Sequence, residues 1–508
     1  MFSNNLSTKK PVIRKKTVLV PVSKTTTIGT KSAPTGTPGR PRDRNRFTLT
    51  QTTTTSLIKQ RPKTVPSRAL ASVRGVKRKS ASPGNQFSDE SDGDNDSSDL
   101  GASDSDASRK RIKSSRSSVS SLSGPQRELV CPTAFQEDTK RLRIVHGADA
   151  TSGKHESKYR NAWDHGNVQT CELQYPSRSR PEQFQLKSPV TSDDYRPMED
   201  IETTIDTIVR FYLPDELGIK YLQGEQGFQG RFNKARARED IFDWLSIVDD
   251  FNALLRPLVQ DGTIESELRK QSTIHLDWIK RILNQIYVRV VSPDVRKLSS
   301  YEAGSDNVYG ELLPRLVTDI FHKTGLTHEK IFIDLGSGVG NVVLQAALEI
   351  GCESWGIEQM PGPCDLAELQ AKEFKARSQL WGLNVGSVNL LRGDMTNHAE
   401  IPGLLQRADV VLVNNQAFTP ELNEQLIYMF LDLKEGAKVV SLKPFIPDGH
   451  KMAERNIESV MNRFVQRKET YYTDSVSWSW QGNGNWYIAT KDIRPLQMFE
   501  KRREMLKA

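Results

Sequence analysis

Apolar residues, cysteines and long hydrophobic runs are all scarce in this 508-residue sequence. Only 36% of the residues are apolar, below the about 45–50% of typical globular domains, so a long polar segment must dilute the core. No run of about 18 apolar residues occurs, which excludes a transmembrane helix, and the polar start at 1–16 lacks the apolar stretch of a secretory signal. The four cysteines form no C-x-x-C pair. We therefore expect no membrane contact, no disulfide framework, no metal site and a reducing, intracellular setting.

Charge is distributed unevenly along the chain. Residues 1–88 carry 19 Lys or Arg and a single acid, whereas residues 89–106 carry eight acids and no base. Residues 107–189 have a net charge of +7 and the remainder a net charge of −9, within a total of +8. A basic arm joined to a mildly acidic body indicates a polyanionic partner.

The first 190 residues lack a sustained apolar period, and we predict that 1–190 is a disordered arm. Its Ser/Asp tract at 88–106 is typical of an acidic, phosphorylatable spacer. Pro38–Arg42 resembles an AT-hook for A·T-rich DNA, although a plain phosphate-binding arm explains the same residues. Basic clusters at 77–79 and 109–113 are typical of nuclear import signals, and a solvated charge run remains the alternative.

Helical periodicity begins near residue 197. Apolar residues recur on one helical face over Met198–Tyr212, Glu239–Leu255 and Ile264–Val291. We predict a helical subdomain over 197–300.

From 301 to 495 short apolar runs alternate with helical stretches, which predicts a mostly parallel sheet covered by helices on both faces. The expected strands are Lys330–Asp334, Glu353–Glu358, Ser387–Arg392, Ala408–Asn414 and Ala437–Leu442, with a closing hairpin of Ser475–Trp480 and Asn485–Thr490. The expected helices are Asn341–Ile350, Asp365–Trp381 and Glu421–Leu431.

The most informative segment is Ile333–Asn341, in which a strand ends and three alternating glycines precede a helix. Glycines allow sharp turns and let a ligand approach the main chain. The dinucleotide fingerprint asks for Gly or Ala at position 341, where this chain has Asn341. The spacing D-x-G-x-G-x-G instead resembles motif I of class I methyltransferases that use S-adenosylmethionine. A tight strand–helix turn without a ligand is the structural alternative.

Acids also follow the next two predicted strands. Glu358 ends the second strand, 22 residues after Gly336, where a carboxylate can accept hydrogen bonds from both ribose hydroxyls. Asp394 follows the third strand and can bind an adenine amino group, while Met395 offers an apolar wall. Alone, Glu358 could be a solvated charge and Gly393–Asp394 an ordinary turn; together with the glycine loop they indicate a nucleoside site.

Four motifs in order identify a family. VYGEL at 308–312, DLGSGVGN at 334–341, VNN-x-AF at 413–418 and SVSW at 475–478 closely resemble the disruptor-of-telomeric-silencing family of histone H3 lysine-79 methyltransferases, in a fungal form. The resemblance covers about 200–490. It implies a class I, Rossmann-like S-adenosylmethionine-dependent methyltransferase fold, not the SET fold, preceded by the helical subdomain and the basic arm.

The resemblance implies roles for individual residues. The cofactor would be bound by Tyr309, Gly310, Glu311, Leu312, Phe332, Ile333, Asp334, Leu335, Gly336, Ser337, Gly338, Val339, Gly340, Asn341, Glu358, Asp394 and Met395. The lysine channel would be formed by Asn414, by Trp478 or Trp480, and by Trp486 or Tyr487. Core or rim packing is the alternative for each aromatic residue. The chain departs from the family at Gln416, where Phe is usual, which makes one channel wall more polar.

The activity implied is methyl transfer from S-adenosylmethionine to a lysine of the nucleosome core. Because positive charge moves from sulfur to nitrogen, we expect catalysis by positioning and desolvation, with no general base. The family implies nuclear localisation, roles in chromatin organisation, telomeric silencing and the DNA damage response, and contacts with histone H3, the histone H4 tail and ubiquitin on histone H2B, with DNA bound by the arm. The alternatives are a methyltransferase of another basic protein and a non-catalytic chromatin scaffold.

Overall fold

The computed structural model describes residues 127–136, 142–164, 166–192, 194–222, 224, 226–300, 310–472, 475–477 and 483–507. All of these belong to one compact unit, Lys77–Ala508, and the second unit, Met1–Val76, lies outside the described residues. The predicted basic arm, AT-hook, import signals and Ser/Asp tract also lie outside them.

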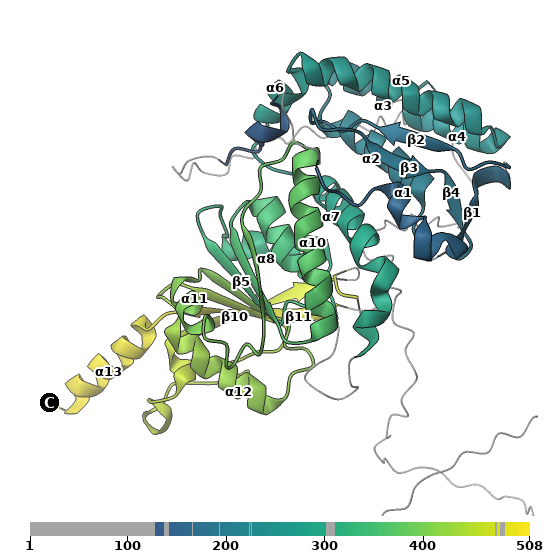
Figure 1. The fold of residues 1–508 in the computed structure, drawn as a ribbon. Coiled ribbons are helices and arrows are strands. Elements are labelled where there is room, and N and C mark those ends of the chain that lie inside the picture. Colours follow the sequence, from purple (N-terminus) through teal and green to yellow (C-terminus); the bar gives the residue numbers. More distant parts are fainter. Residues whose placement is uncertain are drawn as a thin grey trace, which may run out of the picture. The chain divides into compact units, whose positions relative to one another are not determined.

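A seven-stranded sheet is the centre of the C-terminal part of the described structure (Figure 1). In spatial order its strands are β10 (Phe464–Tyr471), β11 (Gly484–Lys491), β9 (Lys438–Ser441), β8 (Val410–Val413), β5 (Ile331–Leu335), β6 (Glu353–Glu358) and β7 (Val388–Arg392). Strands β9 to β7 are parallel, and β10 and β11 add an antiparallel hairpin at one edge. The chain reverses its direction of strand addition between β5 and β8, which creates a topological switch point.

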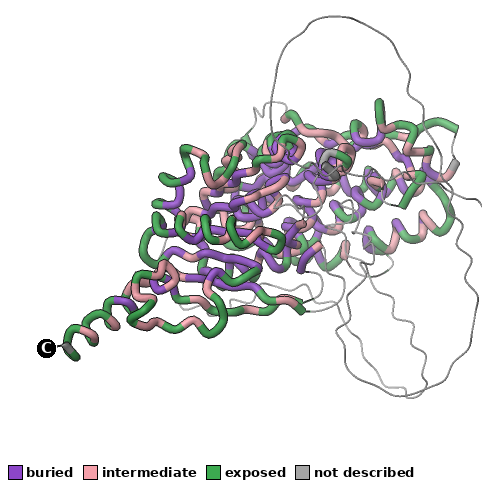
Figure 2. Tube along the Cα trace, turned by 90° about the horizontal axis from the view of Figure 1, so that it is seen from below, coloured by how far each residue is buried: buried purple, intermediate pink, exposed green. Residues whose placement is uncertain are grey.

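Helices cover both faces of this sheet. Phe332 of β5 packs with α8 (Pro314–Thr324) and α9 (Asn341–Gln345), whereas Ile333 and Leu335 pack on the opposite face. That opposite face is covered by α11 (Ile401–Arg407) and α12 (Pro420–Met429). The predicted α/β fold is therefore confirmed, and the buried positions run through the sheet and its covering helices (Figure 2).

The sheet strands predicted from apolar runs are all present, but the closing hairpin is wrong in its first arm. Its two strands are β10 and β11, and Val476 makes only an isolated bridge to Leu312. Strand β10 reads FVQRKETY and lies at the sheet edge, where solvent-facing charges protect against further strand pairing. A search for apolar runs does not find such a strand.

The predicted helical region contains α2 (Pro197–Phe211), α3 (Asp215–Leu222), α4 (Phe228–Arg238), α5 (Ile241–Gln260), α6 (Thr263–Arg269) and α7 (Leu276–Val290). Ile264–Val291, which we read as one helical face, is in fact divided between α6 and α7. The side chain of His275 accepts a hydrogen bond from the Asp277 amide and starts the second helix. None of the described helices is both long and apolar enough to cross a lipid bilayer.

The prediction of disorder up to residue 190 is wrong for the described part of that range. Helix α1 (Gly147–Ala150) and the strand pairs β1 (Tyr159–Asn161) with β4 (Lys187–Pro189) and β2 (Thr170–Leu173) with β3 (Glu182–Gln185) occupy it. Tyr175 and Phe184 are buried in the core that also contains α7.

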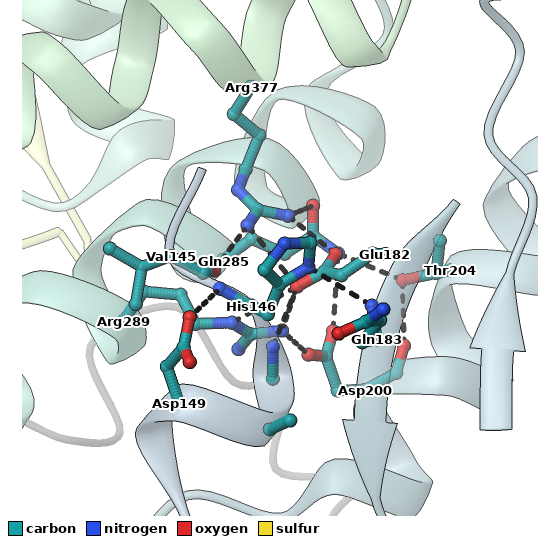
Figure 3. Close-up of polar contacts among 12 residues, drawn as sticks. Val145, His146, Asp149, Glu182, Gln183, Asp200, Thr204, Gln285, Arg289 and Arg377 are labelled. Carbon is teal, nitrogen blue, oxygen red and sulfur yellow. Dashed lines mark hydrogen bonds and ion pairs between the residues drawn. The ribbon is translucent and has the colours of Figure 1, made fainter. Parts of the chain in front are cut away.

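Charge pairing explains why this segment escaped prediction. Glu182 is buried and accepts hydrogen bonds from Arg377 of α10 (Pro361–Leu380) at 2.9 Å and from Arg289 of α7 at 3.0 Å (Figure 3). Arg289 also pairs with Asp200 of α2. Charged residues usually indicate solvent exposure, but here they pair across elements far apart in sequence.

Candidate functional site

A cavity opens at the carboxyl ends of β5, β6 and β8, at the switch point of the sheet. Its walls include Asp334 and Gly336 from the end of β5, Glu358 from β6 and Asn414 after β8. Gly310 and Glu311, which precede α8, close another side. Ligands of open parallel sheets bind in this position because the loops after neighbouring strands diverge there.

The glycine loop after β5 has the shape that its sequence predicts. Gly336 and Gly338 have φ angles of +90° and +55°, a region that side chains with a Cβ rarely adopt. The amides of Gly336 and Ser337 both donate to the Ile357 carbonyl oxygen, at 3.0 and 2.9 Å. These bonds fix the loop against β6 and leave its outer edge facing the cavity.

Three carboxylates line the cavity, and no Lys or Arg does so among the described lining residues: the acids are Glu311, Asp334 and Glu358. Asp334 is 4% exposed, and burial together with the charge of Glu358 raises its pKa to about 7. Such a cavity repels phosphate groups and attracts a cation. This charge pattern favours a sulfonium cofactor over a dinucleotide.

Glu358 is held in place at the end of β6 by backbone amides. One carboxylate oxygen accepts from the Gly338 amide at 3.0 Å, and the other accepts from the amides of Gln359 and Met360 at 2.9 and 2.8 Å. The carboxylate thus links the glycine loop to the second strand, with its orientation fixed before any ligand binds.

Asn414 presents an unused acceptor to the site. Its Nδ2 donates to the Gly310 carbonyl oxygen at 2.9 Å, while its Oδ1 is buried and has no hydrogen-bond partner among the described residues. Buried amide oxygens without a donor are rare because desolvation is costly. The residue therefore has an acceptor available for a donor that arrives from outside the chain.

A segment from near the C-terminus joins the cavity wall. Leu312 and Val476 form an antiparallel bridge, and the Leu313 amide donates to the Ser475 carbonyl oxygen at 3.0 Å. Ser477 exchanges two hydrogen bonds of 2.9 Å with the backbone of Glu311. The described parts of the VYGEL and SVSW motifs are therefore paired, although Tyr309, Trp478 and Trp480 lie outside the described residues.

Other predicted residues take different positions. Leu312, Ser337, Val339, Asn341 and Met395 line the cavity, while Gly340 begins α9.

The side chains of Phe332, Ile333 and Leu335 are in the hydrophobic core and do not line the cavity. Asp394 is exposed, and its carboxylate accepts from the Thr396 amide at 2.9 Å. The three core residues can therefore contact a ligand only through their backbone. Asp394 would have to rotate its side chain to do so.

Two predicted channel residues do not line this cavity. Trp486 is buried in the core beside α8, with Lys323 Nζ 5.5 Å from its ring centroid, and Tyr487 lies on β11 opposite Ser441 of β9. Gln416 is exposed and does not line it either.

Phe418 was missed as a site residue, although it belongs to the VNN-x-AF motif. It lines the cavity near Gly336, at which an added Cβ would lie 3.7 Å from the Phe418 ring. Val342, Ile357, Gln359, Leu412 and Leu422 also line the cavity. Four of them are ordinary apolar strand and helix residues, and Gln359 directly follows β6; no local signal in the sequence marks them as cavity residues.

Comparisons with known proteins match both the motifs and most of the chain. A family model described as "Histone methylation protein DOT1" matches residues 287–491. The protein "Histone-lysine N-methyltransferase, H3 lysine-79 specific" of Emericella nidulans is 46% identical over 367 residues, 72% of this chain and 73% of that protein. Its namesake in Aspergillus fumigatus is 42% identical over 472 residues, 92% of this chain and 90% of that protein.

Proposed function

The chain belongs to the DOT1 family of histone methylation proteins, and on that premise we propose that it methylates lysine 79 of histone H3 in nucleosomes, using S-adenosylmethionine. The observation that carries the proposal is the cavity at the switch point, lined by three carboxylates, a glycine loop and the unpaired Asn414 oxygen. Each of these features fits one part of the reaction.

The cavity residues fit this cofactor by charge and by shape. Glu311 and Asp334 suit its cationic methionine end, and Glu358 suits the two hydroxyls of a ribose. Met395 and Phe418 supply apolar surface for a purine ring. The bound cofactor would supply a methyl group on a positively charged sulfur.

Asn414 is the residue best placed to orient the lysine. Its free Oδ1 can accept an N–H of a neutral amine, while its Nδ2 stays bound to Gly310. Leu412, Phe418 and Leu422 make the adjoining wall apolar, and such a wall lowers the pKa of an entering ammonium group. The chain thus contributes orientation and desolvation, which suffice where no strong acid or base is required.

Contacts beyond the lysine are proposed from net charge and from the family resemblance. The net charge of +18 over residues 1–88 supports DNA binding through released counterions, and the −9 body supports docking of the basic histone H4 tail. Ubiquitin on histone H2B and the channel aromatics Trp478 and Tyr487 rest on the family resemblance alone. Nuclear localisation is part of the same proposal, because the proposed substrate is chromatin.

The direct test is methyl transfer to reconstituted nucleosomes and to free histones, with the modified residue located by mass spectrometry. We expect modification of lysine 79 of histone H3 in nucleosomes. Gly336→Arg is the matched negative variant, because its side chain enters the cavity between Met395 and Phe418 from a backbone at φ +90°. Modification of a different basic protein, or absence of cofactor binding in the wild type, would replace this function with one of the two alternatives.

A further inference from the structure

A buried glutamine lies directly behind the glycine loop. Gln370 of α10 is 1% exposed, and its Nε2 donates to the Val339 carbonyl oxygen at 2.7 Å and to Asn341 Oδ1 at 3.1 Å. Val339 and Asn341 line the cavity, whereas Gln370 does not. The glutamine is therefore connected to the cavity by hydrogen bonds to two of its lining residues.

These contacts fix which way the Asn341 amide faces. A backbone carbonyl can only accept, so the nitrogen of Gln370 must point toward Val339. The same nitrogen then meets the oxygen of Asn341, which leaves Asn341 Nδ2 to donate to Glu311 Oε1 at 3.1 Å. The hydrogen bonds from Gln370 to Asn341 and from Asn341 to Glu311 therefore run in one donor-to-acceptor direction, and the last acceptor is a cavity carboxylate.

We propose that Gln370 is a positioning residue that orients Asn341 and thereby holds the Glu311 carboxylate at the cavity wall for the cationic part of the methyl donor. The inference rests on the proposed function, since it concerns the same cavity. Without Gln370, Asn341 Oδ1 loses the amide donor that it faces at 3.1 Å, which weakens the preference for this orientation of its amide. Asn341 can then turn its oxygen toward Glu311, where two acceptors repel each other.

The chain contains a matched control in a second buried glutamine. Gln345 of α9 is 2% exposed, and its Nε2 donates to the Pro314 carbonyl oxygen at 2.9 Å and to Glu349 Oε2 at 2.8 Å. It does not line the cavity, and its bonds to described residues do not reach the glycine loop. Gln370→Met and Gln345→Met therefore remove the same group from similarly buried sites, and only the first breaks the chain to Glu311.

The experiment is calorimetric titration of S-adenosylmethionine into the full-length wild type and both variants, with steady-state kinetics on nucleosomes. We expect Gln370→Met to raise the Kd about tenfold, which corresponds to about 1.4 kcal/mol, and to raise KM for the cofactor while kcat changes less than about twofold. Gln345→Met should lower thermal stability to a similar degree with its Kd unchanged. Equal Kd values for the two variants would overturn the inference.

A second variant covers the case in which Gln370→Met does not fold. Asn341→Asp keeps an oxygen toward Gln370 but replaces the donor that faces Glu311, so it should weaken cofactor binding at least as much. Adding Gln370→Met to Asn341→Asp should then raise the Kd little further, because position 341 no longer has a donor to be oriented. If the Kd increases of the two single variants multiply in the double variant, the proposed hydrogen-bond series is contradicted. Failure of the wild type to bind the cofactor would refute the proposed function instead.

Discussion

Two groups of buried carboxylates in this molecule have opposite surroundings. Between β3, α2, α7 and α10, Glu182 pairs with Arg289 and Arg377, and Asp200 pairs with Arg289 (Figure 3). In the cavity, Asp334 faces Glu358 and no lining cation among the described residues. Burial alone raises the pKa of a carboxyl group, but at Glu182 the two arginines outweigh burial and lower it, whereas at Asp334 burial and Glu358 together raise it to about 7.

This difference assigns a structural role to the Glu182 group and a ligand-binding role to the Asp334 group. The Glu182 group is satisfied within the chain, and it connects β3 to α7 and α10. The carboxylates around Asp334 have no cationic partner among the described lining residues, so a bound cation can pair with them. Perturbed titratable groups in a cleft are typical of functional sites, whereas internally paired groups are typical of structural networks.

The largest expected effect comes from breaking the paired group. Arg377→Met removes the guanidinium that contacts Glu182 and Glu373 at 2.9 and 2.7 Å, which leaves Arg289 as the remaining arginine partner of Glu182 among the described residues. We expect a loss of about 3–5 kcal/mol in the free energy of unfolding, measured by urea denaturation. Arg392→Met is the control, because Arg392 pairs with Asp365 and Glu368 at the exposed surface, and it should change stability little. Equal losses of unfolding free energy in Arg377→Met and Arg392→Met would show that the buried Arg377 pairs stabilise the protein no more than surface pairs do.

The cavity carboxylate should behave in the opposite sense. A folded-state pKa near 7 is above the ordinary value of 3.8, so ionised Asp334 destabilises the fold. The cost is absent below pH 3.8, grows as the pH rises and is complete above about pH 7. Asp334→Asn should therefore stabilise the protein at pH 8, by about 4 kcal/mol at most, while weakening cofactor binding.

Urea denaturation of wild type and Asp334→Asn at pH 8 and pH 5 measures this effect. The gain should be larger at the higher pH. A variant that is less stable at pH 8 would show that Asp334 has a structural partner and resembles Glu182 after all.

The smallest expected effect is in the pH dependence of ligand binding. A cation beside Asp334 favours its ionised form, so binding near pH 6.5 should release a proton, and affinity should rise with pH and level off above about pH 7. Calorimetry in two buffers of different ionisation enthalpy measures the release. Asp334→Asn should show none; affinity that falls as pH rises would contradict the assigned charge.

Local signals made the cavity predictable to a large extent. The glycine loop, the strand ends at Asp334 and Glu358, and the position of Asn414 follow from short stretches of sequence in which turn chemistry and apolar runs coincide. The parallel order of the central strands followed from their alternation with helices.

The remaining features depend on contacts between distant residues. In the sequence Glu182 has the character of an exposed polar residue, because its partner Arg377 is 195 positions away. The sequence of strand β10 has the charged character of a loop, and only its pairing with β11 makes it a strand. Gln370 has no signal of its own, because only the fold brings it behind Val339.

The most direct test of the central claim is a calorimetric comparison of S-adenosylmethionine with a nicotinamide dinucleotide on the full-length protein. Three lining carboxylates, with no Lys or Arg among the lining residues that the structure describes, predict saturable binding of the sulfonium compound and none of the dinucleotide. Binding of the dinucleotide, or of neither compound, would contradict the account.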